Sequence, residues 1–230
     1  MGEKKKKEES RKKWTKIGLL ILAVLFVVVM VVSSMGTNWI TGLAPVRPGD
    51  RVVIDYTIYD AAGNPLVTTS QQVYQQAAQA GSGIMYAKTL TLIANQSLNQ
   101  GTFPVPVYTG TNGGSWQQFA LFSPEHDALT RGLVGMRLND KKNIAFTANT
   151  SMSQLWSPAQ LQKNNINMSD IHVGDFLTMG VSDNPNATAQ NSSASTYLRV
   201  GAVTRVSPAG VVVNFGYPNA DITVDSVNKQ

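Results

Sequence analysis

An uninterrupted apolar run near the N-terminus constrains this chain more than any other feature. Residues 17–32 read IGLLILAVLFVVVMVV and contain no charged residue, and SSM extends the run to residue 35. In a helix rising about 1.5 Å per residue the run would reach roughly 28 Å, close to the ~30 Å hydrocarbon core of a bilayer. Trp14 and Trp39 flank it, as interfacial anchors do. The sequence therefore predicts a single transmembrane helix over residues 17–35.

The distribution of charge predicts an orientation for that helix. Residues 1–16 hold eight Lys/Arg and three Glu, which accounts for the whole net charge of +5. Since basic flanks stay in the cytoplasm, we expect a cytoplasmic tail over 1–16 and, beyond a linker over 36–48, a folded part outside the cytoplasm of a single-pass membrane protein. A cleaved signal peptide is the alternative, but the apolar run is longer than usual and SSMG is a poor cleavage site.

The composition of the remaining 214 residues limits the classes of molecule that the protein could bind. They carry 11 basic and 11 acidic side chains, and this neutral balance argues against nucleic acid, which needs a basic surface. The chain has no cysteine, so disulfides and thiolate chemistry are excluded. N-x-S/T sequons predict a glycoprotein, although about three would occur by chance in a region so rich in Asn, Ser and Thr. The sequons lie at Asn95, Asn149, Asn167, Asn186 and Asn191.

Local patterns predict an α+β protein dominated by antiparallel strands. Apolar residues alternate over 51–59, which is typical of a half-buried strand, and a turn follows at 61–65. We expect a short helix over 71–80 and, from there to residue 115, a surface excursion holding at most a hairpin. A helix that starts near Ser123 should bury one face and end at Gly135. The segments VGDFLTMGV, YLRVGAVTRV and GVVVNF read as strands.

A search for reactive side chains returns nothing. His126 and His172 are the only histidines, which cannot build a His-rich metal site, and no metalloprotease, calcium, phosphate or dinucleotide motif occurs. We therefore expect no metal and no cofactor. What remains is a binding module, a structural protein, or an enzyme whose chemistry needs no acid, base or nucleophile.

Three motifs in order resemble the FKBP-type peptidyl-prolyl cis-trans isomerases, specifically the SlyD-like branch with an inserted flap domain that acts as a chaperone. GDRVVIDYTIYDAAGNPLVTTS (49–70) resembles the opening strand and turn of the family, and HDALTRGLVGMRLNDKK (126–142) resembles its helix and following turn. YLRVGAVTRVSPAGVVVNFGYPNADITVDSV (197–227) resembles the flap strands and the return to the first domain.

The resemblance implies an architecture. We expect an FKBP-like antiparallel half-barrel sheet around one helix, spanning residues 49–152 with an atypical insertion at 71–115. A small β-rich flap domain should occupy 153–214, and 215–230 should return as a strand of the first domain. The activity implied is prolyl isomerisation, in which an apolar pocket desolvates the amide and favours its twisted form over a barrier of about 18–20 kcal/mol.

The family pocket carries over residue by residue, with departures. Tyr56 matches the tyrosine of the first strand, whereas Leu66 replaces an aromatic residue and Val67 an aspartate. Phe119 would supply the remaining aromatic wall, and the backbone of His126 would contact the substrate. Leu129 occupies the pocket floor, and Met152 stands where the family has a second tyrosine. Ordinary core packing is the competing interpretation for Tyr56, Leu66, Phe119, Leu129 and Met152, and a merely exposed position is the one for His126. The two lost polar groups predict weak isomerase activity or none.

The flap domain is the second candidate site. In the family its apolar strands hold unfolded chain, and here the corresponding residues are Phe176, Leu177, Met179, Tyr197 and Leu198, all of which could equally belong to a core.

Two hypotheses of different classes follow. One is a membrane-anchored isomerase and chaperone for unfolded or proline-containing exported proteins. The other is a non-catalytic FKBP-fold scaffold that binds a protein partner through the insertion at 71–115.

Overall fold

The computed structural model describes residues 16, 18–31, 33, 44–110, 114–147, 152–182 and 196–229. The chain divides into two compact units, Met1–Ala44 and Pro45–Gln230. Three predicted glycosylation sites, Asn149, Asn186 and Asn191, lie outside the described residues.

The first unit contains a helix whose described residues include 18–31. Over the described part of the chain, no helix is long and apolar enough to cross a membrane. The predicted transmembrane helix over 17–35, and with it the single-pass anchor, is therefore wrong.

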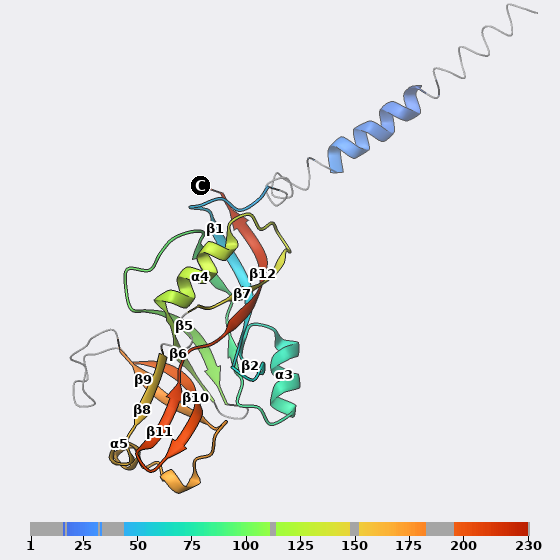
Figure 1. Cartoon of the computed structure of the whole chain (residues 1–230). Coiled ribbons are helices and arrows are strands. Elements are labelled where there is room, and N and C mark those ends of the chain that lie inside the picture. The colour runs from blue at the N-terminus through green and yellow to red at the C-terminus, as the bar shows by residue number, and fades with distance from the viewer. Residues whose placement is uncertain are drawn as a thin grey trace, which may run out of the picture. The chain divides into compact units, whose positions relative to one another are not determined.

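The second unit is built on one mixed sheet that curls into a half-barrel (Figure 1). The strands run in the order β7-β12-β1-β2-β3-β5-β6-β10-β11-β8, with β4 paired to β1 and β9 to β10. Their bounds are β1 Arg51–Tyr59, β2 Pro65–Thr68, β3 Met85–Ala87, β4 Leu90–Ile93, β5 Thr102–Thr109, β6 Ser115–Phe122, β7 Lys141–Ala145, β8 Ser153–Trp156, β9 Phe176–Val181, β10 Tyr197–Ser207, β11 Gly210–Asn214 and β12 Asn219–Asn228.

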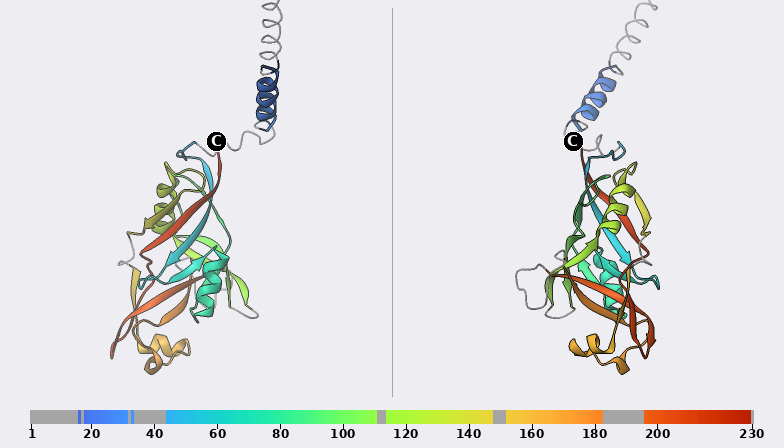
Figure 2. Two further views of the ribbon diagram at one scale, coloured as in Figure 1. Left: turned by 90° about the vertical axis from the view of Figure 1, so that its right-hand side faces the viewer. Right: turned by 60° about the vertical axis from the view of Figure 1, so that its left-hand side comes forward.

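This architecture corrects the predicted fold class in two further respects. The sheet is not purely antiparallel, because β2 pairs with β3 and β6 with β10 in parallel. In place of one helix, the described part of the second unit holds α3 (Gln71–Gln79), α4 (Ser123–Leu133), α5 (Pro158–Lys163) and the 3-10 helix η2 (Met168–Asp170). Figure 1 shows α4 across the sheet of β1, β7 and β12, and α3 beside β2. Figure 2 shows α5 with β8–β11 at the other end of this unit from α4.

At the centre of the half-barrel, the first strand of the unit pairs with the last. β1 pairs with β12 from Arg51 opposite Asn228 to Tyr59 opposite Asn219. β12 in turn pairs with β7, so the last strand lies between two strands that precede it by many residues. The alternation that predicted β1 is borne out in its burial, since Val52, Ile54, Tyr56 and Ile58 are all buried.

Two glycines shape the end of α4, Gly132 inside the helix and Gly135 just after it. Gly135 has φ +86°, a left-handed conformation that favours glycine and ends the helix. A Cβ on Gly132 would lie 2.4 Å from Cδ1 of Ile144, so the missing side chain lets β7 approach the helix. Leu133 and Met136 on either side are buried in the core.

The segment 81–115 is the largest departure from expectation within the sheet. Instead of a surface excursion with at most a hairpin, it supplies β3, β4, β5 and the start of β6. β5 and β6 pair along eight residues, from Thr102 opposite Phe122 to Thr109 opposite Ser115. Val105, Val107, Phe119 and Leu121 of this hairpin are at most 2% exposed. The hairpin is therefore part of the core.

Two hydrophobic clusters hold the unit together. The larger one is drawn mainly from β1–β7, α4 and β12 and also includes Val200 of β10 and Tyr217. The smaller one gathers Trp156, Leu161, Ile171, Val203, Val211, Val213 and Phe215. The smaller cluster falls in the stretch for which the resemblance implies a flap. Residues 45–230 nevertheless form one compact unit, so the domain boundary at residue 153 stays a prediction.

Candidate functional site

Most of the predicted pocket residues lie inside the larger core cluster. Tyr56, Leu66, Val67, Phe119 and Leu129 are at most 4% exposed and all belong to that cluster. The hairpin β5–β6 covers them, because its inward residues Val105, Val107 and Phe119 pack into the same cluster. None of these five side chains therefore borders open space.

His126 and Met152 lie elsewhere. His126 is 5% exposed, stacks on Phe103 with ring centroids 5.1 Å apart, and places Nδ1 3.1 Å from Oδ1 of Asp127. Met152 is half-buried and packs against the smaller cluster. The structure thus brings five of the seven predicted pocket residues together, with Met152 in a different cluster.

The Tyr56 hydroxyl is a buried polar group without a hydrogen-bond partner in the described residues. Burial raises the pKa of Tyr56 above its ordinary value. A buried hydroxyl that lacks a partner loses its hydration without compensation. Among the described residues, the Tyr56 side chain is therefore a neutral phenol in the core whose hydroxyl makes no hydrogen bond.

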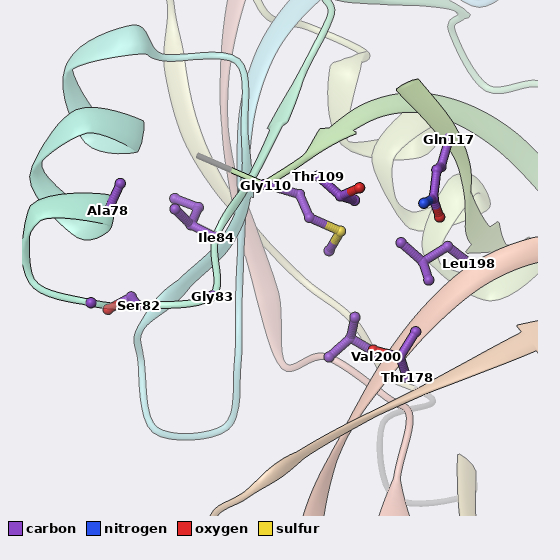
Figure 3. Close-up of a pocket in the computed structure, with 12 residues that line it drawn as sticks. Ala78, Ser82, Gly83, Ile84, Thr109, Gly110, Gln117, Thr178, Leu198 and Val200 are labelled. Carbon is purple, nitrogen blue, oxygen red and sulfur yellow. The ribbon is translucent and has the colours of Figure 1, made fainter. Parts of the chain in front are cut away.

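An open cleft of about 610 Å³ lies next to this core (Figure 3). Three segments form its walls: Ala78 with 81–85, then Thr109, Gly110 and Gln117 of the hairpin, and Thr178, Leu198 and Val200 of β9 and β10. The lining combines apolar side chains with hydroxyl and amide groups, and no lining residue is charged. An uncharged lining of this kind suits a chain segment that presents apolar side chains and backbone amides.

The predicted flap residues divide between the two faces of the β9–β10 sheet. Leu177 and Met179 are half-buried against the smaller cluster. Phe176 pairs with Ala202, Thr178 with Val200, and Gly180 with Leu198, and paired residues share one face. This face therefore joins the cleft residues Leu198 and Val200 to Phe176, which is 47% exposed. Tyr197 is half-buried opposite Val181, on the face of Leu177 and Met179.

The same face continues across β11 to β8. Ala202 pairs with Asn214, and Val212 with Leu155, which is 50% exposed. Apolar side chains thus recur on this face from the cleft to β8, with Asn214 opposite Ala202 and Arg205 opposite Val212 between them. We call this surface, formed by Leu155, Phe176, Leu198, Val200, Ala202 and Val212, the apolar strip.

A buried ion pair behind the cleft was not anticipated from the sequence. Arg199 is 0% and Glu125 1% exposed, and Arg199 Nη1 donates to Glu125 Oε2 at 2.9 Å. The guanidinium also donates to the carbonyl oxygens of Ala120 and Phe215 and lies 3.9 Å from the Tyr217 ring centroid. The only signal was an arginine surrounded by apolar residues in YLRVGAV. Because Arg199 lies between Leu198 and Val200, the pair fixes the wall of the cleft.

The remaining sites named from the sequence, two sequons and His172, lie at exposed positions. Asn95 and Asn167 are exposed, so each sequon is accessible, and His172 is exposed as well. No group of three or more His, Asp or Glu that could hold a metal occurs among the described residues.

Comparison with known proteins identified no relationship: no family model matches the chain, and no curated protein matches it. The resemblance to the FKBP-type isomerases stays a prediction that rests on the three motifs.

Proposed function

We propose that this protein is a folding factor of FKBP-like architecture that holds unfolded or proline-containing chain, with weak isomerase activity or none. The observation that carries the proposal is the uncharged cleft of about 610 Å³ that continues into the apolar strip. The exposed large apolar side chains of the strip are Phe176 and Leu155, at 47% and 50%, and exposed apolar patches mark binding sites in soluble monomers. The position of β12 between β7 and β1 supports the architecture, because the resemblance implies a C-terminal return strand.

A non-catalytic scaffold is the second candidate, and the burial of the pocket residues favours it. An isomerase pocket must admit a prolyl ring, but Tyr56, Leu66 and Leu129 are at most 4% exposed. Catalysis would then require displacement of the β5–β6 hairpin. Holding of chain on the apolar strip requires no such movement.

The test is suppression of client aggregation by the full chain, with the variant Phe176→Ser beside the control Val173→Ser. Val173 is 65% exposed but precedes β9 and is outside the apolar strip. Loss of the exposed ring should weaken holding about tenfold, since a fully buried Phe contributes about 1.5–3 kcal/mol. The control should hold clients as the parent does. Equal holding by both variants, or none by the parent, would exclude the proposal.

Prolyl isomerisation of a short peptide by the same samples tests whether the protein also catalyses isomerisation. Turnover above the uncatalysed rate that Leu66→Trp abolishes would favour catalysis at the predicted pocket. Holding without turnover is the result expected of a scaffold or holdase.

A further inference from the structure

Four aromatic rings form a row on the outer face of β3, β5 and β6. The register places Tyr86 opposite Tyr108 and Tyr108 opposite Trp116, so the three side chains share one face. Tyr108 and Trp116 meet edge to face with centroids 5.8 Å apart, and Tyr74 of α3 meets Tyr86 at 5.5 Å. We call these four residues the aromatic platform.

The platform faces away from both the core and the cleft. Side chains alternate along a strand, and the neighbours of Tyr108 and Trp116, namely Val107, Thr109 and Gln117, point to the opposite face. Val107 is fully buried, whereas Thr109 and Gln117 line the cleft. Trp116 is 50% exposed. The platform is thus independent of the surface proposed to hold unfolded chain.

The sequence segment that supplies the platform carries almost no charge. Between Asp60 and Glu125 the sequence contains a single charged residue, Lys88. Its Nζ lies 4.9 Å from the centroid of the Trp116 ring. The acidic residues that bound this segment do not face the surface, since Asp60 is 4% and Glu125 1% exposed. No ion pair of Lys88 occurs in the part of the chain that the structure describes.

We propose that the aromatic platform binds an anionic polysaccharide. The C–H faces of sugar rings are apolar and stack on Trp116 and Tyr108, as other apolar groups pack on aromatic faces. A carboxylate on the sugar pairs with the ammonium of Lys88, which forms no ion pair with any residue that the structure describes. The amide of Gln118, opposite Pro106 on the same face, is placed to bond sugar hydroxyls.

Charge decides between this ligand and the alternatives. One ammonium is too little for a nucleic acid, whose backbone requires a basic surface. An uncharged proline-rich peptide would stack on the same rings but would gain nothing from Lys88. An acidic sugar chain uses both the rings and the charge.

The experiment is calorimetric titration of the full chain with oligogalacturonides and with the same oligomers methyl-esterified, which keeps the rings and removes the charge. The parent should prefer the acidic form, and added salt should weaken only that form. Trp116→Ala should bind about tenfold more weakly, whereas Trp116→Tyr should stay within about threefold, because a ring remains. Lys88→Met should bind both forms equally.

Leu155→Ala is the matched control, because Leu155 is as exposed as Trp116 but belongs to the apolar strip. It should bind the oligogalacturonides as the parent does. No binding by the parent, unchanged binding by Trp116→Ala, or tighter binding of the esterified oligomers or of a proline-rich peptide would overturn the proposal. These outcomes do not touch the holding of unfolded chain, which Phe176→Ser tests.

Discussion

At the scale of single residues, two buried tyrosines of equal exposure differ in one respect. Tyr56 and Tyr217 are each 3% exposed. The Tyr217 hydroxyl donates to the carbonyl oxygen of Val200 at 2.7 Å, whereas the Tyr56 hydroxyl has no hydrogen-bond partner among the described residues. Burial raises the pKa of both phenols. Substitutions at the two positions therefore separate the free-energy cost of a buried hydroxyl without a hydrogen bond from the free-energy gain of one with a hydrogen bond.

We expect Tyr56→Phe to raise the free energy of unfolding by about 1 kcal/mol, since it removes an unpaired polar atom. Tyr217→Phe, the matched control, should lower it by about 1 kcal/mol, because a buried carbonyl loses its donor. Denaturant unfolding of the three proteins measures both changes. A loss of stability in Tyr56→Phe would mean that the hydroxyl has a partner after all.

The sequence could not anticipate where these residues lie. The alternation in β1 correctly predicted that Tyr56 points inward, and the resemblance alone assigned it to a pocket. Whether an inward residue lines a cavity or a filled core depends on what covers it, here β5–β6. A hairpin was allowed in that segment but was placed on the surface, because Pro104 and Pro106 lack N–H donors and Gly and Thr surround the run, all of which argue against buried paired strands.

At the scale of elements, Asp127 of α4 forms a hydrogen bond to the loop between β4 and β5. Its Oδ1 accepts the N–H of Leu98 at 2.8 Å and lies 3.1 Å from Nδ1 of His126. Burial alone would raise the pKa of Asp127, but the hydrogen bonds from Leu98, His126 and Ser97 outweigh it and hold the pKa below its ordinary value. The ionised carboxylate is thus favoured in the folded state.

The folded protein should accordingly lose the contribution of Asp127 in acid. A pKa lowered by folding gives stability that is complete above the unfolded value of about 3.9 and disappears as pH falls through the folded value. Asp127→Asn should therefore be less stable than the parent at neutral pH, by about 1 kcal/mol, and equally stable once the pH lies below the folded pKa. Urea unfolding over a pH series measures the difference. A gap that persists unchanged into acid would contradict the assignment.

Element boundaries were predictable where the pattern was local. β1, α3 and α4 follow from alternation, a polar helix and a buried helical face, and Gly135 ends the helix as expected. The transmembrane helix was wrong although its composition fits a bilayer, since no helix in the described part of the chain is long and apolar enough to cross a membrane. The ion pair of Arg199 and Glu125 joins residues 74 positions apart, a distance that no local pattern encodes.

At the scale of the whole unit, this ion pair ties the two hydrophobic clusters together. Glu125 belongs to α4 beside the larger cluster, whereas Arg199 belongs to β10 and donates to the carbonyl oxygen of Phe215 in the smaller one. Each charge is buried and compensates the other. The pair thereby links β10 to α4, and with them the two clusters.

Removal of one partner should consequently cost more than removal of both. We expect Arg199→Met to lower the free energy of unfolding by about 3–5 kcal/mol, because the Glu125 carboxylate is left buried and uncompensated. The double variant Arg199→Met with Glu125→Leu should recover part of this loss. A double-mutant cycle by denaturant unfolding tests the coupling. Additive losses would show that the two side chains act independently.

The near absence of charge between Asp60 and Glu125 has a consequence for the unfolded chain. This segment supplies β2 to β6, which are strands of high apolar content, and Lys88 is its single charged residue. Once unfolded, it has almost no like-charge repulsion to oppose pairing of strands between molecules. Thermal denaturation should then be irreversible, so that melting temperatures would report a rate and not an equilibrium.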